Sequence, residues 1–251
     1  MTPKTFLTYE APPLVSMLQA DTPDRIKELL QLSRESGAEA FGMQFCRLKN
    51  EYKTKETYKN LLSSTGSLPV YVTNYRYDTN EGKSDEVLGE ELCLLAEYGA
   101  TLCDVMGDLY DKCEGELTMN EDAVKKQMLL IDALHKRGAE VLMSSHVLKF
   151  TPAERVLEIA LEHKRRGADI SKIVTSAETA AEEIENLRTI DLLKRELPIP
   201  FLFLAGGECK ILRRIGANLG NCMSLCVHEH DAFSTAAQPL LREMRILKDV
   251  F

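Results

Sequence analysis

The feature that most limits the fold of this chain is a repeated alternation of short apolar runs with longer amphipathic segments. The longer segments, such as DRIKELLQLSRESG, repeat apolar residues at the three- and four-residue spacing of helices, and several end at a glycine suited to a helix C-cap. Eight short runs have the length and composition of buried strands. They are LVSML at 14–18, FGMQFC at 41–46, VYVTNY at 70–75, TLCDVM at 101–106, EVLMSS at 140–145, DISKIV at 169–174, PFLFLA at 200–205 and CMSLCV at 222–227.

Eight strand–helix units in a chain of 251 residues predict an α/β fold of the TIM (β/α)8 barrel type. A Rossmann-like open sheet is the main alternative, but no G-x-G-x-x-G follows the first strand. No low-complexity segment or linker divides the chain, so we expect one barrel domain over residues 1–251. In such a barrel the active site lies where the strands end and the following loops begin.

Charge and cysteine content exclude several kinds of partner. The net charge of −8 and the pI near 5.3, without a long basic block, argue against binding to nucleic acid or to an anionic membrane surface. The seven cysteines are odd in number and fit free thiols in a reducing compartment. No apolar run reaches the length of a membrane helix, and the first residues lack the apolar stretch of a secretory signal. We therefore expect a cytoplasmic protein that acts on a small molecule.

A histidine and a lysine lie near the ends of neighbouring predicted strands. His146 follows the fifth run, and Lys172 lies within the sixth. A lysine among apolar residues is costly to keep charged, so its pKa should fall and its amine should attack carbonyls. The histidine can transfer protons near neutral pH. The pair predicts Schiff-base chemistry with acid/base assistance, the alternatives being a surface lysine and a hydrogen-bonded structural histidine.

The sequence around these two residues resembles a known family. VLMSSHVLKFTP and GADISKI match the Met-Ser-x-His-x-x-x-x-Thr-Pro and Gly-Ala-Asp-x-x-Lys stretches of type I 3-dehydroquinate dehydratases, which are TIM-barrel lyases. The resemblance implies that Lys172 forms an imine with the ketone of 3-dehydroquinate. It implies that His146 moves the protons on the way to 3-dehydroshikimate, a step of the shikimate pathway, without a metal or an organic cofactor.

Two further segments extend the resemblance through the C-terminal half. In KILRRIGANLG, Arg213 falls on the arginine that binds the substrate carboxylate in the family. Ser234 and Gln238 keep the Ser-x-x-x-Gln pattern of the loop that covers the substrate. The resemblance therefore implies a carboxylate-bearing ketone as substrate, a lid over it, and a homodimer.

The N-terminal half departs from the family pattern. The second strand of the family carries Glu-x-Arg, whereas this chain has Gln44, Phe45 and Cys46 there, with Arg47 one place later. We expect Gln44 to bind substrate, and Arg47 to do so if the strand's end or a bulge turns it toward the site. The fourth strand has Asp104-Val105-Met106 where the family tends to have Asp-x-Glu.

The segment after the third strand also differs in spacing. Arg76 and Glu81 are five positions apart, against four between the corresponding arginine and glutamate of the family. We expect Arg76 to bind substrate and Glu81, or a close neighbour, to orient His146. The changes on three strands indicate a divergent member, with weakened activity or an altered substrate.

Other functions stay open at this point. One is a different lysine-dependent aldolase or lyase on the same barrel, with the Gly206-Gly207 turn holding a sugar phosphate. Another is a small-molecule-binding protein that has lost catalysis. A zinc site is a further alternative, although ligands spaced along an extended strand rarely surround one ion. Its candidate ligands are Cys222, Cys226, His228 and His230.

Overall fold

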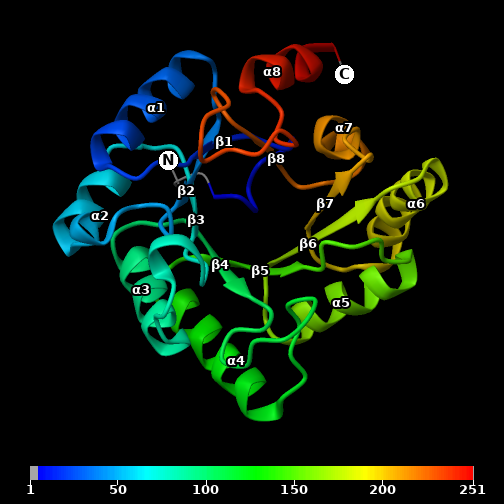
Figure 1. Cartoon of the computed structure of the whole chain (residues 1–251), viewed down its shortest axis with the longest axis horizontal. Helices are drawn as coiled ribbons and strands as arrows, with labels where there is room; N and C mark the ends of the chain where they lie inside the picture. The colour runs from blue at the N-terminus through cyan, green and yellow to red at the C-terminus, as the bar shows by residue number, and fades with distance from the viewer. Residues whose placement is uncertain (1–4, 251) are drawn as a thin grey trace.

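The computed structural model describes residues 5–250, whose strands form one parallel sheet that curls around a central axis with the helices outside it (Figure 1). The strands are β1 (Leu14–Leu18), β2 (Ala40–Gln44), β3 (Val70–Thr73), β4 (Leu102–Met106), β5 (Glu140–His146), β6 (Ile170–Ala177), β7 (Phe201–Gly207) and β8 (Ser224–Cys226). Each strand overlaps the apolar run that predicted it, and the TIM-barrel prediction is confirmed.

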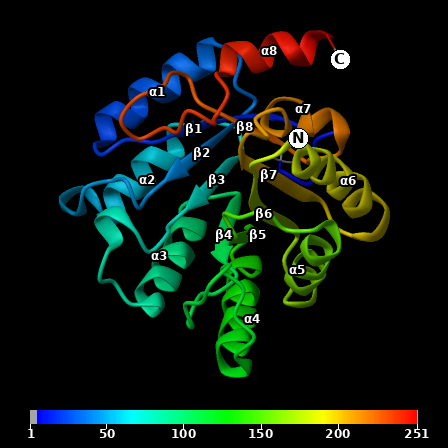
Figure 2. The same ribbon diagram turned by 45° about the vertical axis from the view of Figure 1, so that its right-hand side comes forward.

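Helices alternate with the strands along the chain and cover the outside of the sheet (Figure 2). They are α1 (Pro23–Glu35), α2 (Lys55–Ser63), α3 (Asp85–Glu97), α4 (Glu121–His135), α5 (Ala153–Arg165), α6 (Ala180–Glu196), α7 (Leu212–Leu219) and α8 (Leu241–Val250), with two 3-10 turns, η1 (Asn50–Tyr52) and η2 (Asp78–Asn80). Side-chain caps explain several starts. Thr22, Ser84 and Thr179 each accept a hydrogen bond from the first turn of the helix that follows. In residues 5–250 no helix is both long and apolar enough to cross a bilayer.

The sheet runs in the order β7-β6-β5-β4-β3-β2-β1-β8, and within the described residues no ladder joins β7 to β8. A side-chain amide bridges this seam. Asn221 accepts from the backbone N–H of Phe203 at 2.8 Å and donates to the carbonyl of Phe203 at 2.9 Å. Gly216 makes room for it, because a Cβ there would lie 2.5 Å from Asn221 Nδ2. The side-chain amide of Asn221 thus bonds to the backbone N–H and C=O of Phe203, which a neighbouring strand would do elsewhere in the sheet.

Side chains alternate between two cores, as expected for strands buried on both faces. Along β1, Val15 and Met17 lie in the barrel interior, whereas Leu14 and Leu18 pack in the outer core beneath the helices. The interior cluster takes a residue from every strand: Val15, Ala40, Tyr71, Leu102, Leu142, Ile170, Leu202 and Leu225.

The register between β5 and β6 decides where the predicted catalytic pair lies. Lys172 is the partner of Ser144, and His146 is the partner of Val174 two residues further along. Because alternate residues share a face, Lys172 and His146 lie on the same side of the sheet, with His146 two residues further along the strands than Lys172. Both are therefore brought to the carboxyl end of the barrel.

Candidate active site

A cavity of about 220 Å³ lies at the carboxyl ends of the strands. Six of the nine predicted site residues line it, namely Lys172, His146, Arg213, Gln238, Gln44 and Arg47. Most of its remaining wall comes from apolar and aromatic side chains, with Gln19, Thr73 and Thr235 as further polar residues. The apolar and aromatic residues include Met17, Tyr71, Tyr75, Tyr77, Leu204 and Leu225. A hollow of about 550 Å³ between α3 and α4 is larger, but no predicted site residue lines it. The chemistry is therefore concentrated in the smaller cavity.

Lys172 is almost fully buried, and its amine is surrounded by polar atoms. Its Nζ lies 2.7 Å from Tyr75 Oη, 3.1 Å from Tyr71 Oη and 3.2 Å from Asp104 Oδ2. The apolar surroundings expected from the strand sequence are therefore wrong at the amine end. Apolar surroundings were expected because Lys172 lies between apolar residues of its own strand. Its polar neighbours come from other strands: Tyr71 lies in β3, Tyr75 just after β3, and Asp104 in β4.

Asp104 is fully buried beneath the amine, and hydroxyl groups satisfy its carboxylate. Ser144 donates to Oδ1 at 2.6 Å, Tyr75 donates to Oδ2 at 2.6 Å, and Tyr71 also donates to Oδ2. Burial alone would raise the pKa of the Asp104 carboxyl, but the Lys172 ammonium and these donors outweigh burial and lower that pKa. Burial, reinforced by the carboxylate, raises the pKa of each tyrosine well above its ordinary value. The two phenols thus remain protonated donors at neutral pH.

His146 contacts a glutamate that the sequence did not suggest. Its Nδ1 lies 2.6 Å from Glu116 Oε2, and its backbone N–H donates to the same oxygen at 3.0 Å. The imidazole meets the Tyr75 ring edge-on, with 5.3 Å between ring centroids. Within the described residues Nε2 makes no hydrogen bond to protein, so this nitrogen is the one available to a ligand.

The prediction that Glu81 orients His146 is therefore wrong in this structure. Glu81 is exposed at the end of η2, where its backbone N–H donates to Asp78. The turn of η2 carries this carboxylate to the surface, and Glu116 from the β4–α4 loop takes the place beside the histidine ring.

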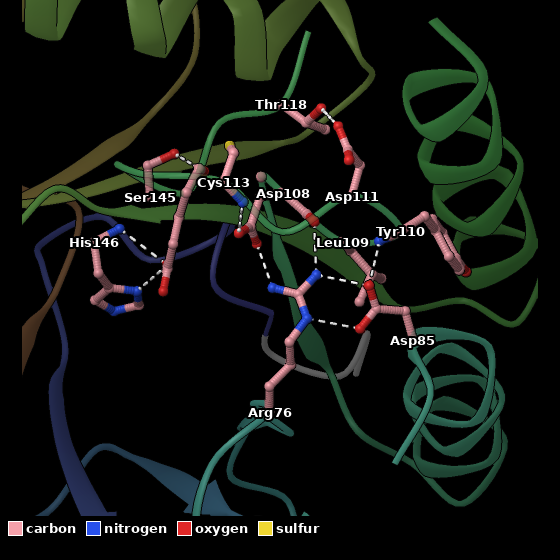
Figure 3. A network of polar contacts seen from close by, with 12 residues as sticks. Arg76, Asp85, Asp108, Leu109, Tyr110, Asp111, Cys113, Thr118, Ser145 and His146 are labelled. Atoms are coloured by element: carbon pink, nitrogen blue, oxygen red, sulfur yellow. Dashed lines mark hydrogen bonds and ion pairs between the residues drawn. The ribbon is translucent and has the colours of Figure 1, made fainter. Parts of the chain in front are cut away.

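Arg76 is likewise outside the cavity, contrary to prediction. Its guanidinium makes a two-point contact with Asp85, at 2.6 and 2.7 Å, and a contact of 2.6 Å with the carboxylate of Asp108 (Figure 3). It also donates to the carbonyl of Asp108. Four N–H donors of Arg76 are thus used by Asp85 and Asp108, so this side chain ties the start of the β4–α4 loop to α3 and does not line the cavity.

Arg213 is placed as a carboxylate-binding group. Its Nε donates to the carbonyl of Ala205 at 3.0 Å, and in the described part of the chain its two terminal nitrogens bond to no carboxylate. Burial lowers the pKa of Arg213. A partly buried guanidinium at a cavity wall without an acidic partner favours an anionic ligand.

Gln44 lines the cavity through a neutral hydrogen-bonded chain. Gln19 donates to Gln44 Oε1 at 2.7 Å, and Gln44 Nε2 donates to Tyr77 Oη at 2.9 Å. Gln19 lies just after β1 and was not singled out from the sequence. Gln44 thus presents a neutral amide at the position where the family pattern has a glutamate.

Arg47 reaches the cavity because β2 ends at Gln44 and the chain then turns. Its Nη1 contacts Asp78 Oδ1 at 2.9 Å, and its guanidinium carbon lies 5.7 Å from the Tyr77 ring and 5.9 Å from the Phe233 ring. The strand's end thus re-aims Arg47 as the sequence allowed. Its contact with Phe233 joins the second strand to the β8–α8 loop.

The loop between β8 and α8 covers part of the cavity. Gln238 lines it, with Oε1 accepting from the backbone N–H of Thr235 at 2.9 Å. Ser234 does not line it. Its hydroxyl accepts from the backbone N–H of Asp231 at 2.8 Å, so a local turn holds this side chain, and Thr235 lies at the cavity instead.

The four candidate zinc ligands do not form a metal-binding cluster within residues 5–250. Among residues 5–250, no three His, Cys, Asp or Glu side chains are grouped as metal ligands. Two of the candidates have other partners, because Cys226 donates to the carbonyl of Val15 and His230 contacts that of Gln238. The extended strand spacing keeps the four side chains apart.

The glycine pair expected to form a turn after the seventh strand lies instead at the end of β7, where Gly206 pairs with Ser176 and Gly207 with Ala177 of β6. Gly207 has a φ of +66°, and a Cβ there would lie 2.3 Å from the carbonyl of Ala177. The next backbone N–H, of Glu208, already donates to that carbonyl, and Glu178 is close by. A phosphate would meet carboxylates here, which weakens the sugar-phosphate alternative.

Comparisons with known proteins agree with this geometry. The family model described as type I 3-dehydroquinase matches residues 15–249. A 3-dehydroquinate dehydratase of Geobacillus thermodenitrificans is 23% identical over 190 residues, which are 75% of this chain and 70% of the relative. One of Alkaliphilus oremlandii is 30% identical over 106 residues, 41% of this chain and 40% of the relative.

Solved structures show the same fold at low identity. A 3-dehydroquinate dehydratase of Geobacillus kaustophilus has a TM-score of 0.79 at 16% identity, over 96% of this chain and 91% of that one. A type I enzyme of Clostridium difficile has a TM-score of 0.78 at 13% identity, over 96% and 93%. With nearly the whole sequence matched by the family model, the chain belongs to the type I 3-dehydroquinase family.

Proposed function

We propose that this chain dehydrates 3-dehydroquinate to 3-dehydroshikimate through an imine on Lys172, the dehydration step of the shikimate pathway. The observation that carries the proposal is the shared cavity. The amine of Lys172, the imidazole of His146 and the guanidinium of Arg213 all line it. The substrate would need a ketone for the amine, a carboxylate for the guanidinium and an acidic C–H within reach of the imidazole.

The reaction begins at Lys172. In its neutral form the amine attacks the ring ketone to give a carbinolamine, and loss of water from that species gives an iminium. The iminium draws electrons from the adjacent C–H bond, and His146 Nε2 removes that proton to leave an enamine. The enamine then expels the hydroxyl on the next carbon, which leaves as water after His146 returns the proton. Hydrolysis of the product iminium restores the free amine.

The groups around the amine support these steps. Tyr75 Oη lies 2.7 Å from Nζ and 2.6 Å from Asp104 Oδ2, so its hydroxyl is close to the oxygen that leaves the carbinolamine. The buried Asp104 carboxylate offsets the positive charge of the iminium at Lys172. Arg213, which is anchored to the carbonyl of Ala205 on β7, binds the substrate carboxylate by a charge-assisted pair.

A trapping experiment tests this proposal directly. Incubation with 3-dehydroquinate and borohydride should reduce the imine and add the mass of the reduced ligand to the peptide that contains Lys172. Lys172→Ala should abolish both adduct and product. Lys149→Ala is the matched control. Lys149 comes three positions after His146, the last residue of β5, but its side chain is exposed and its Nζ lies 2.6 Å from Glu114 Oε1.

The outcomes separate the alternative functions. An adduct on Lys172 together with 3-dehydroshikimate formation supports the proposal. An adduct without dehydration would overturn it in favour of another Schiff-base lyase, and binding without an adduct would overturn it in favour of a non-catalytic protein. Loss of the adduct in the Lys149 variant would also contradict the assignment.

A further inference from the structure

The contact between Glu116 and His146 determines which ring nitrogen carries the proton. One carboxylate oxygen, Oε2, accepts from both the backbone N–H of His146 and its Nδ1. In a neutral imidazole one nitrogen is a donor and the other an acceptor, so an acceptor 2.6 Å from Nδ1 selects the Nδ1–H form. Nε2 is then left unprotonated, which is the state that a general base at the cavity needs.

The backbone at Glu116 is held in an uncommon conformation. Its φ is +49°, in the left-handed region that residues other than glycine rarely adopt. Ser145 donates to the carbonyl of Glu116 at 2.6 Å, on the strand that carries the histidine. Gly107 permits this close approach, because a Cβ there would lie 2.5 Å from the same carbonyl. The loop is thus built against β5 where Glu116 meets His146.

Two arginines hold the loop on either side of Glu116. Arg76 binds Asp108 near its start, as Figure 3 shows, through both the carboxylate and the carbonyl. Arg166 is almost fully buried and donates to the carbonyls of Gly107 at 2.8 Å and Thr118 at 2.5 Å. The contacts of a buried guanidinium such as that of Arg166 are costly to break. Both ends of the segment from 107 to 118 are therefore fixed.

We infer that Glu116, presented by this clamped β4–α4 loop, is the positioning residue that fixes the orientation and tautomer of His146. Its effect on turnover rests on the proposed function, whereas its effect on the tautomer does not. Arg76 acts one step further out, by holding the loop in place.

The test compares Glu116→Ala and Glu116→Gln with Glu114→Gln. Glu114 is two positions away on the same loop, but its side chain is 86% exposed and pairs with Lys149. Nitrogen NMR of histidine-labelled protein reports the tautomer of His146 without any substrate, with His146→Gln used to assign its signals. The parent and Glu114→Gln should show the Nδ1–H form, and Glu116→Ala should lose it.

Turnover provides the second measurement. Removing a partner that orients a functional histidine typically costs about 10–100-fold, so kcat of Glu116→Ala should fall by that factor with KM little changed. Glu116→Gln keeps an oxygen that can accept both hydrogen bonds and should recover most of the loss. Borohydride trapping on Lys172 should persist in all variants, because no contact of Glu116 involves the amine.

The results test the proposed function and the positioning role of Glu116 separately. If the parent neither traps ligand nor dehydrates it, the proposed function fails, and the NMR comparison still tests Glu116. If Glu116→Ala keeps the parent tautomer, the inference is overturned whatever the rate. A loss of kcat in Glu114→Gln equal to that in Glu116→Ala would also overturn it. Should Glu116→Ala not fold, Glu116→Gly retains the test, because glycine suits the φ of +49° and removes the carboxylate; this variant should lose the Nδ1–H form, and keeping it would overturn the inference.

Discussion

Acid sensitivity of the fold should depend on a second histidine, His163 on α5. It is fully buried, with Nδ1 2.9 Å from Ser171 Oγ and Nε2 3.0 Å from Ser145 Oγ. Because the Ser145 hydroxyl donates to the carbonyl of Glu116, it accepts from His163, which places the proton on Nε2. Burial, with a further contribution from the charge of Arg166, lowers the pKa of His163 from 6.5 to about 3.

The sign and size of the effect follow from linkage. The folded pKa is below the unfolded one, so stability is fully present above pH 6.5 and is lost as the pH falls toward 3. At pH 5 the unfolded histidine has bound a proton that the folded one has not. The free energy of unfolding should therefore be about 2 kcal/mol lower than at pH 7.5 from this group alone, which is 2.303RT times about 1.5 units.

Urea unfolding at pH 7.5 and pH 5.0 measures this difference. His163→Gln removes the titrating ring, so its loss of stability between the two pH values should be about 2 kcal/mol smaller than that of the parent chain. His135→Gln is the control, because His135 lies at the surface beside Asp169 and should leave most of the parent's loss in place. Equal losses in the parent and in His163→Gln would refute the reasoning.

Three further substitutions test the assignments around the cavity. Asp104→Asn should lower the free energy of unfolding by about 3–5 kcal/mol by urea titration, because it leaves a buried ammonium without its carboxylate, and an unchanged midpoint would contradict this. Since the pKa of Asp104 is lowered in the fold, its contribution should also disappear as the pH falls below about 4. Arg213→Gln should raise KM for 3-dehydroquinate by roughly 10–100-fold, the value of a charged hydrogen bond, whereas Arg214→Gln outside the cavity should not. Cys46→Arg should lower the melting temperature, because Cys46 packs fully buried in the outer core, and an improved kcat/KM would show that position 46 faces the substrate instead.

The strands could be predicted because their signal is local. Each apolar run marks a segment buried on both faces, and the run at 14–18 has the same bounds as β1. The predicted bounds are wrong at several strand ends, because hydrogen-bond pairing with the neighbouring strand determines where a strand ends. Ala177 is in β6 because it pairs with Gly207 of β7, although neither lies in an apolar run. A strand end fixed by a neighbouring strand leaves little trace in its own sequence.

Part of the environment of Lys172 could be predicted from the sequence, because a carboxylate within an apolar strand requires a cationic partner. The sequence correctly placed Lys172 and His146 near the ends of neighbouring strands, and the register between β5 and β6 brings both to one face. Asp104 lies within the fourth apolar run, where an isolated carboxylate is too costly to bury without a cationic partner. Its presence there predicts a buried lysine or arginine facing it across the barrel. Lys172, on the strand two places along the sheet, is the residue that meets this requirement.

The partner of His146 was harder to find, because the contact depends on how a long loop folds. Glu81 fits the family spacing within one residue, yet η2 turns it away, and Glu116 lies 30 positions from the histidine. The loop between β4 and α4 covers residues 107–120, and a connection of this length without regular structure is usually functional. Its length could have drawn attention to its acidic residues. The contacts that Arg76, Arg166 and Ser145 make with this loop explain why Glu116, rather than the exposed Glu114, is the one brought to the ring.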